Sequence, residues 1–160
     1  MFHRTKIKHK DQQMVYIQGN EIAYTKSTKF LGVIIDNKLN WSEHILYIKN
    51  KISKSIGIIF KIRNFLDKNA LRNIYFTFIY PYLTYCVEIW GNAHASHLDP
   101  VIKLQKKSIR AITFSHYLDH TAPLFRKLNI LSFKKLVTQR ISLMMYKHHI
   151  DILPYPIDYL

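Results

Sequence analysis

The pattern of apolar and polar positions changes about forty residues into the chain. Residues 14–24 contain two short β-prone runs joined at Gly19-Asn20, which is a two-residue hairpin signal. Residues 30–35 (FLGVII) are continuously apolar and rich in β-branched side chains, which is typical of a strand buried on both faces. Because a hairpin and one strand are not stable alone, we expect this segment to be the edge of a larger sheet.

Downstream of this segment the periodicity becomes helical. Asn40 and Glu43 have the spacing of a capping box, which predicts a helix that begins at Trp41. One apolar stripe then recurs at spacings of three and four, as expected for a helix with one buried face. Its members are Ile45, Ile48, Ile52, Ile56 and Ile59. Lys54 and Lys61 fall on the opposite face.

Two further helix starts are indicated by capping residues. Asp67 predicts the N-cap of a second helix, which Pro81 must kink or split because proline lacks the backbone N–H. Asp99 followed by Pro100 predicts the first residues of a third helix.

The last two helices are predicted in the same way. Thr121 begins a short helix, and Ser132 caps a final helix that runs to about His149. We therefore predict a mainly α fold with a small N-terminal β segment. The expected divisions are a β segment at 1–40, a helical region at 41–150 and an irregular tail at 151–160.

Composition limits the class of protein. The chain has 160 residues, 48% of them hydrophobic, which is enough for a folded core. Cys86 is the single cysteine, so no internal disulfide can form and a reducing, intracellular location (cytoplasmic or nuclear) is expected. The uncharged run at 74–87 is shorter than the roughly 20 residues of a membrane span and is interrupted by Pro81. We interpret it as a buried helix pair and expect no membrane partner.

Charge points to a polyanionic partner. The formal net charge is +14, which favours nucleic acid or an acidic membrane surface. Four cations form one stripe on the predicted third helix, opposite its apolar positions, and such a face suits phosphate groups. The stripe comprises Lys103, Lys106, Lys107 and Arg110. The alternative is an ordinary solvated helix face.

Catalytic and metal signals are weak. His94 and His97, and His116 and His120, have ligand-like spacings, but the chain lacks the cysteines of a structural zinc site. No Gly-rich phosphate loop or nucleophile elbow occurs, and the ten carboxylates are scattered. We therefore expect this chain alone to be no enzyme and to hold no cofactor.

Four segments, in this order, resemble the region just downstream of the catalytic palm in reverse transcriptases of non-LTR (LINE-type, jockey-like) retrotransposons. They read KFLGVIIDNKLNWSEHI (29–45), FIYPYLTYCVEIWGNA (78–93), LQKKSIRAIT (104–113) and HTAPLFRKLNIL (120–131). The resemblance implies that residues 1–40 are the edge of a polymerase palm, with MFHRTK at 1–6 similar to the strand after the active-site hairpin. The helices from Trp41 onward then match the thumb and the region after it, which hold template–primer.

The resemblance also implies particular site residues. Phe30, Leu31 and Gly32 match the primer-grip motif, which positions the primer 3′ end. The family's Tyr-x-Asp-Asp hairpin and its earlier Asp, which bind two Mg²⁺ ions, have no counterpart here. Without the two metal ions the transition state of nucleotidyl transfer is not stabilised. Mg²⁺ is thus expected only for the complete parent polymerase.

The resemblance therefore predicts a non-catalytic C-terminal fragment of an RNA-directed DNA polymerase, from a truncated reading frame or a degraded element. Its expected partners are template–primer nucleic acid and the missing palm and fingers. The nucleic-acid-binding set is Phe30, Leu31, Gly32, Lys54, Lys61, Lys103, Lys106, Lys107 and Arg110. The alternatives are a stand-alone basic helical module that binds RNA or protein and, less favoured, a membrane-associated helical protein.

Overall fold

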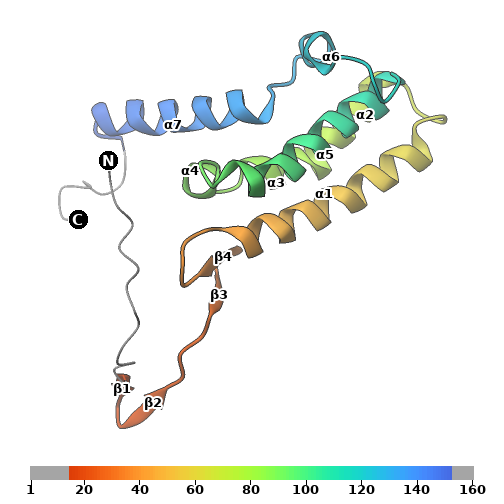
Figure 1. The fold of residues 1–160 in the computed structure, drawn as a ribbon. Coiled ribbons are helices and arrows are strands. Elements are labelled where there is room, and N and C mark those ends of the chain that lie inside the picture. The colour runs from red at the N-terminus through yellow and green to blue at the C-terminus, as the bar shows by residue number, and fades with distance from the viewer. Residues whose placement is uncertain (1–14, 153–160) are drawn as a thin grey trace.

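The computed structural model describes residues 15–152 and is mainly helical, with strands only near the N-terminus (Figure 1). The strands are β1 (Val15–Ile17), β2 (Asn20–Ile22), β3 (Ser27–Phe30) and β4 (Val33–Asp36). The helices are α1 (Ser42–Ile62), α2 (Lys68–Phe78), α3 (Tyr80–Thr84), α4 (Val87–Trp90), α5 (Ala95–Thr113), α6 (Thr121–Lys127) and α7 (Phe133–His149). The predicted fold class is confirmed, including the end of β structure at about residue 36.

The first predicted hairpin is present, with its turn one residue earlier than expected. Strands β1 and β2 pair antiparallel, and Ile17 is opposite Asn20. Asn20 is therefore in the second strand, and the two turn residues are Gln18 (φ 51°) and Gly19 (φ 80°). Two successive positive φ values are the pattern of a type I′ turn, in which glycine is favoured. This hairpin lies apart from the helices (Figure 1).

The prediction of one continuous strand over residues 30–35 is wrong. Strands β3 and β4 form a second antiparallel hairpin in which Phe30 is opposite Val33. Leu31 (φ 44°) and Gly32 (φ 86°) form its two-residue turn. The freedom of glycine at positive φ outweighs the β propensity of the apolar run. Phe30 is 62% exposed and Leu31 74% exposed, so the segment is not buried on both faces.

Helix α1 begins one residue later than predicted and without the capping box. Trp41 is the N-cap, in a left-handed conformation (φ 64°), and Ser42 is the first helical residue. The Asp36 carboxylate accepts the backbone N–H groups of Asn40 (3.3 Å) and Trp41 (2.9 Å), so the Asn40 N–H does not need Glu43. Burial alone would raise the pKa of Asp36, but its backbone hydrogen bonds lower the pKa below the usual value.

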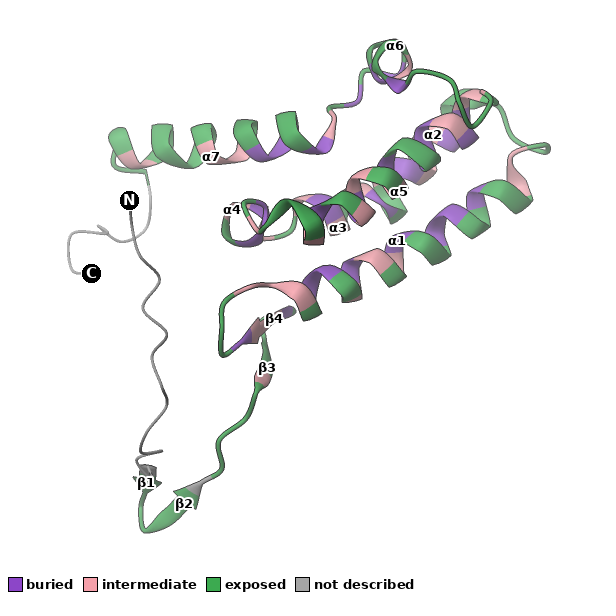
Figure 2. Cartoon of the chain, in the orientation of Figure 1, coloured by how far each residue is buried: buried purple, intermediate pink, exposed green. Residues whose placement is uncertain are grey.

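The core lies between α1, α5 and the elements that connect them (Figure 2). All five isoleucines of the predicted α1 stripe are buried, which confirms that helix register. Trp90 at the end of α4 is fully buried, stacks on Phe133 of α7 with ring centroids 5.5 Å apart and donates to the Tyr85 carbonyl. A Cβ on Gly91 would lie 2.5 Å from a backbone oxygen and 2.9 Å from Val137, so only glycine fits between α4 and α7.

The helix boundaries confirm the Asp67 cap and the predicted starts of the last two helices. Asp67 accepts the Ala70 N–H (2.9 Å) at the start of α2, and the helix breaks at Ile79, two residues before Pro81. Short helix α6 begins at Thr121, as predicted. Helix α7 follows Ser132 and runs to His149, although the Ser132 side chain makes no capping hydrogen bond.

The predicted start of the third helix at Asp99-Pro100 is wrong. Helix α5 begins at Ala95, and Pro100 lies inside it. His94 is the N-cap, and its Nδ1 accepts the Ser96 N–H at 3.4 Å. The first turn is closed by bonds to the His94 carbonyl, and Pro100 follows in the second turn, where it has no N–H to donate to the carbonyl four residues earlier.

Some predictions lie outside the described residues or concern what the described part lacks. The palm-like strand expected at 1–6 and most of the irregular tail at 151–160 are not among residues 15–152. Within that range no helix combines the length and apolar content needed to cross a membrane.

The second half of α7 extends past the other helices (Figure 1).

Candidate nucleic-acid interface

The cationic stripe predicted for the third helix forms the outer face of α5. Lys103, Lys106 and Lys107 are exposed and Arg110 is half-buried. The opposite face of α5 is buried, as predicted, including Val101, Ile109 and Ile112. Helical periodicity therefore places these four cations together, between two hollows of the surface.

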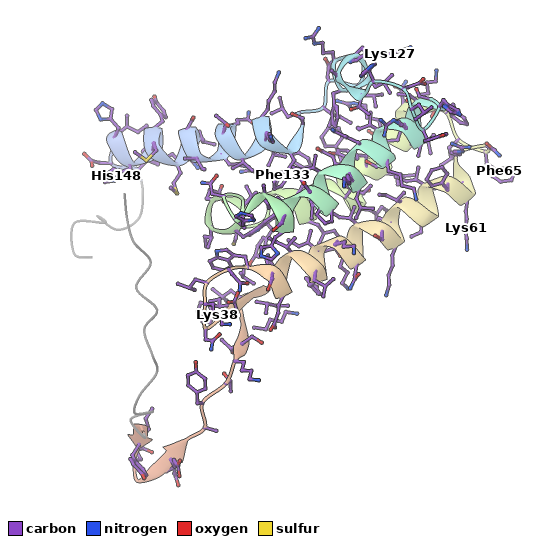
Figure 3. The ribbon with its side chains drawn as sticks, viewed as in Figure 1. Lys38, Lys61, Phe65, Lys127, Phe133 and His148 are labelled. Carbon is purple, nitrogen blue, oxygen red and sulfur yellow. The ribbon has the colours of Figure 1, made fainter. Side chains whose placement is uncertain are left out.

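The wider hollow lies between α5, α6 and the start of α7. Its volume is about 720 Å³, and its basic lining residues are Lys106, His120, Arg126 and Lys135. Arg126 and Lys135 are exposed and, with Lys106, bring three cationic side chains to one concave surface. Concentrated positive charge of this kind attracts phosphate groups. Figure 3 shows the neighbouring Lys127 projecting outward from α6.

A buried glutamine fixes the wall of this wider hollow. The Gln105 side chain donates to the Tyr75 hydroxyl (2.9 Å) and the Leu131 carbonyl (3.0 Å), and it accepts the Phe133 N–H (2.8 Å). Arg72 adds a bond from Nε to the Leu128 carbonyl at 2.7 Å. These contacts hold residues 128–133 against α2 and α5, so the position of α7 relative to the stripe is set by buried polar groups. Burial also raises the pKa of Tyr75 to about 12.

The narrower hollow lies on the α1 side of α5. It has a volume of about 430 Å³ and is lined by Phe60, Arg63, Lys107, Arg110, Ala111, Ser115, His116 and Tyr117. The Arg110 guanidinium donates twice to the Asp119 carbonyl, at 3.0 and 2.8 Å. The Lys107 ammonium lies 5.6 Å from the Phe60 ring centroid. Two of the four predicted cations are therefore already engaged by neighbouring groups.

The two predicted cations of α1 are placed differently. Lys54 and Lys61 are exposed on the face of α1 opposite its buried isoleucines, and neither lines the two hollows beside α5. Figure 3 shows Lys61 pointing away from the bundle. The structure thus does not bring Lys54 and Lys61 to the α5 cations.

The three predicted primer-grip residues lie at the tip of the β3–β4 hairpin. The Tyr85 hydroxyl donates to the Leu31 carbonyl at 2.5 Å, and a Cβ on Gly32 would meet the Tyr85 ring at 3.4 Å. Tyr85 therefore holds the turn while the side chains of Phe30 and Leu31 stay exposed. This tip is built by other elements than those around the α5 stripe, so the predicted residues form two groups rather than one site.

A buried histidine anchors this hairpin to α1. His44 is 2% exposed, and its Nδ1 accepts the Ile34 N–H at 3.3 Å, which leaves the proton on Nε2. The Nε2 atom has no hydrogen-bond partner among the described residues. Burial lowers the pKa of His44 below its usual value because the charged form is poorly solvated there.

The histidine pairs do not form a metal centre in the described part of the chain. His94 and His97 have ring centroids 6.4 Å apart, and His94 is used as a helix cap. No group of three or more His, Cys, Asp or Glu residues that could hold a metal ion occurs within residues 15–152.

Arg126, Lys135 and Arg63 were not among the residues predicted from sequence. Each lies on a different element from the stripe, and only the folded arrangement places it beside α5. The basic character of HTAPLFRKLNIL (120–131) was visible, but the face on which Arg126 lies was not.

Comparisons with known proteins identify relatives of one kind. The chain is 31% identical over 120 residues to the RNA-directed DNA polymerase from mobile element jockey of Drosophila melanogaster, which covers 72% of this chain and 13% of that protein. It is 27% identical over 127 residues to the probable RNA-directed DNA polymerase from transposon X-element of the same species, covering 78% of the chain and 14% of the relative. A third relative, from transposon BS of that species, is 23% identical over 141 residues, 84% of the chain and 16% of the relative.

These relatives are far longer than this chain, which spans between 13% and 16% of their length. No protein-family model matches the chain. No solved structure matches it. The relatives agree with the family resemblance read from the four sequence segments, and they relate this chain to a region of the RNA-directed DNA polymerases of mobile elements.

Proposed function

We propose that this chain is a non-catalytic, C-terminal part of an RNA-directed DNA polymerase of mobile-element type, in which α5 contacts the phosphate backbone of template–primer. The observation that carries the proposal is the stripe of four cations on α5, with Arg126 and Lys135 beside it. The relatives support it because they are polymerases that act on nucleic acid templates. The helical region 41–150 then acts as thumb and following region, and residues 1–40 as the palm edge.

The charge arrangement favours duplex contact through phosphates. Phosphate contacts need charge and reach rather than base-specific geometry, and lysines on one helix face provide both. Each neutralised phosphate contributes about −0.9 to the slope of log K against log salt on duplex. The three exposed lysines thus account for a slope of at most about −2.7, and Arg110 brings that upper limit to about −3.6.

The test is a duplex-binding titration over a range of salt. We expect the variant with all four stripe residues changed to Gln to lose most of the slope and to bind all sequences more weakly alike. The matched control changes four exposed lysines elsewhere, which removes the same charge: Lys26, Lys38, Lys68 and Lys147. If the control loses as much slope as the stripe variant, the contact is a general effect of net charge and the interface proposal fails.

Lys54 and Lys61 form a second proposed contact on the outer face of α1. Both are exposed, and neither side chain has a hydrogen bond or ring contact to another described residue. The double variant to Gln should reduce the duplex salt slope by about 1.8. An unchanged slope would leave this face of α1 as an ordinary solvated surface.

The hairpin tip is proposed to touch the primer 3′ end, as the primer-grip match implies. Its support in the structure is that the side chains of Phe30 and Leu31 are exposed while Tyr85 fixes the turn. Leu31→Ser should therefore weaken binding to a duplex with a recessed 3′ end and leave a blunt duplex unaffected. Equal effects on both duplexes would contradict contact with the end.

The absence of catalysis is also part of the proposal. The parent activity needs carboxylates that hold two metal ions, and the described residues bring no such group together. Primer extension on an RNA template with Mg²⁺ or Mn²⁺ should give no product above a control without protein. Extension by material free of contaminating polymerase would overturn this part.

A further inference from the structure

The ends of α1 and α5 form a cluster of exposed aromatic rings. Phe60 is 39% exposed, Phe114 47% and Tyr117 73%. Two of these rings line the narrower hollow beside α5, with the cations Arg63, Lys107 and Arg110. None of these three rings belongs to the buried core cluster.

The cations in this cluster are held in place by the rings. The Arg63 guanidinium carbon lies 4.9 Å from the Phe60 centroid and 5.2 Å from that of Phe114, and Lys107 lies above the same Phe60 ring. Cation–π contacts of this length are attractive and fix the position of the charges. Phe60 and Phe114 therefore hold the cations and leave Tyr117 as the most exposed ring of the hollow.

The loop that carries Tyr117 is closed by its own hydrogen bonds. The His116 N–H donates to the Asp119 carboxylate at 2.7 Å, and the Asp119 N–H donates to the His116 carbonyl at 3.1 Å. Arg110 ties the same loop to α5 through the Asp119 carbonyl. Tyr117 is thus presented beside the hollow from a braced turn.

We propose that this hollow binds an unpaired base of single-stranded nucleic acid, which stacks on Tyr117 while an adjoining phosphate contacts Lys107. Aromatic rings interleaved with cations are the usual means of binding single strands without sequence preference, because every base has a π face. The proposal rests on the proposed function, since Lys107 and Arg110 belong to the α5 stripe. The inference adds a second class of ligand, single-stranded nucleic acid, which would bind beside the α5 stripe that contacts duplex.

The test separates bases from phosphates. The probes are an oligodeoxythymidylate of about 15 nucleotides, within the site sizes known for single-strand binders, and a chain with the same number of phosphates in which abasic residues replace the nucleosides. Tyr117→Leu should weaken binding of the thymidylate by about 5- to 150-fold, the range that corresponds to losing one stacked base. Binding of the abasic chain should not change.

Two variants serve as controls. Tyr117→Phe keeps the ring and should bind the thymidylate as the wild type does. Tyr146→Leu removes an equally large exposed ring from α7 (60% exposed) and should leave both probes unaffected. Because Tyr117 is exposed, we expect unchanged thermal unfolding for its variants.

Three outcomes would overturn the inference. Equal losses on both probes would mean that Tyr117 only supports the loop that positions the cations. No loss on either probe would mean that the ring is free for another partner, such as a further part of the polymerase. A lost duplex salt slope in the stripe variant, together with normal thymidylate binding by Tyr117→Leu, would retain the proposed function and remove this inference alone.

Discussion

The two sides of the α5 stripe differ in how their cations are held. On the α6–α7 side, Lys106, Arg126 and Lys135 face an open hollow and have no hydrogen bond or ring contact to other described residues. On the α1 side, Lys107 is held by a ring and Arg110 by a carbonyl. The stripe on α5 therefore combines a cation that has no such contact, Lys106, with two cations held by neighbouring groups, Lys107 and Arg110.

The cause of the difference is the neighbour that each side meets. Helices α1 and α5 run parallel and end together, so the aromatic and basic residues at the end of α1 reach the end of α5. On the α6–α7 side, the hydrogen bonds of Gln105 to Leu131 and Phe133 instead set the distance between α5 and the start of α7. Free cations suit many phosphate positions, whereas cations fixed among rings favour one geometry.

The largest expected effect is on the buried core to which α1 contributes. Ile52 is fully buried in α1, so Ile52→Ala should lower the free energy of unfolding by about 2–5 kcal/mol, the range for such changes in cores. Ile58, 48% exposed on the same helix, is the matched control, and Ile58→Ala should cost much less. Denaturant unfolding measures both. Similar losses in the two variants would contradict the helix register.

A somewhat smaller loss of stability should distinguish the α6–α7 side of the α5 stripe from its α1 side. Gln105→Leu removes the Gln105 partner of the buried Phe133 N–H and of the buried Tyr75 hydroxyl, which should cost on the order of 3 kcal/mol at about 1–3 kcal/mol per group. Hydrogen exchange should accelerate at the Phe133 amide and stay slow in α1. Gln139→Leu, an exposed change on α7, is the control. Uniformly faster exchange would show that Gln105 supports the whole bundle instead of one wall.

Low pH should destabilise the contact between the β3–β4 hairpin and α1, which lies apart from both hollows. The pKa of His44 is lowered by burial, so below its usual value of 6.5 the unfolded chain binds the proton first. The stability from neutral His44 is complete above that pH and is lost as the pH falls from there toward the folded pKa. Unfolding at about pH 7.5 and about pH 5.5 should show this loss in the wild type and a smaller one in His44→Phe. Equal losses would assign the acid sensitivity to other groups.

Local signals explain which parts of the fold were predictable. The isoleucine stripe, the Asp67 cap and the break near Pro81 each depend on residues within a few positions, and each is confirmed. The Leu31-Gly32 turn is also a local feature, but the apolar residues on both sides of Gly32 favour a continuous strand and so obscure it. Its two positive φ values, not side-chain polarity, divide that run.

The residues that surround the α5 stripe in the candidate interface were less predictable than the stripe itself. Helical spacing was sufficient to place the four α5 cations on one face. Arg126, Lys135 and Arg63 join them through long-range packing, in which the Gln105 contacts span 26 to 30 residues of sequence. No local pattern indicates which distant cation will share a hollow with α5.

The smallest effects should come from exchanging single charges on neighbouring residues. Lys106→Gln removes a free cation of the wider hollow and should reduce the duplex salt slope by about 0.9. Lys107→Gln should reduce that slope less, because its ammonium is held over Phe60, and should weaken single-strand binding more than Lys106→Gln does. Both variants have the same net charge and lie on the same helix, so each is the control for the other in salt titrations with duplex and with oligodeoxythymidylate. If the two variants respond alike to both probes, the two sides of the stripe are one uniform basic surface, and the distinction between free and positioned charge has no consequence for binding.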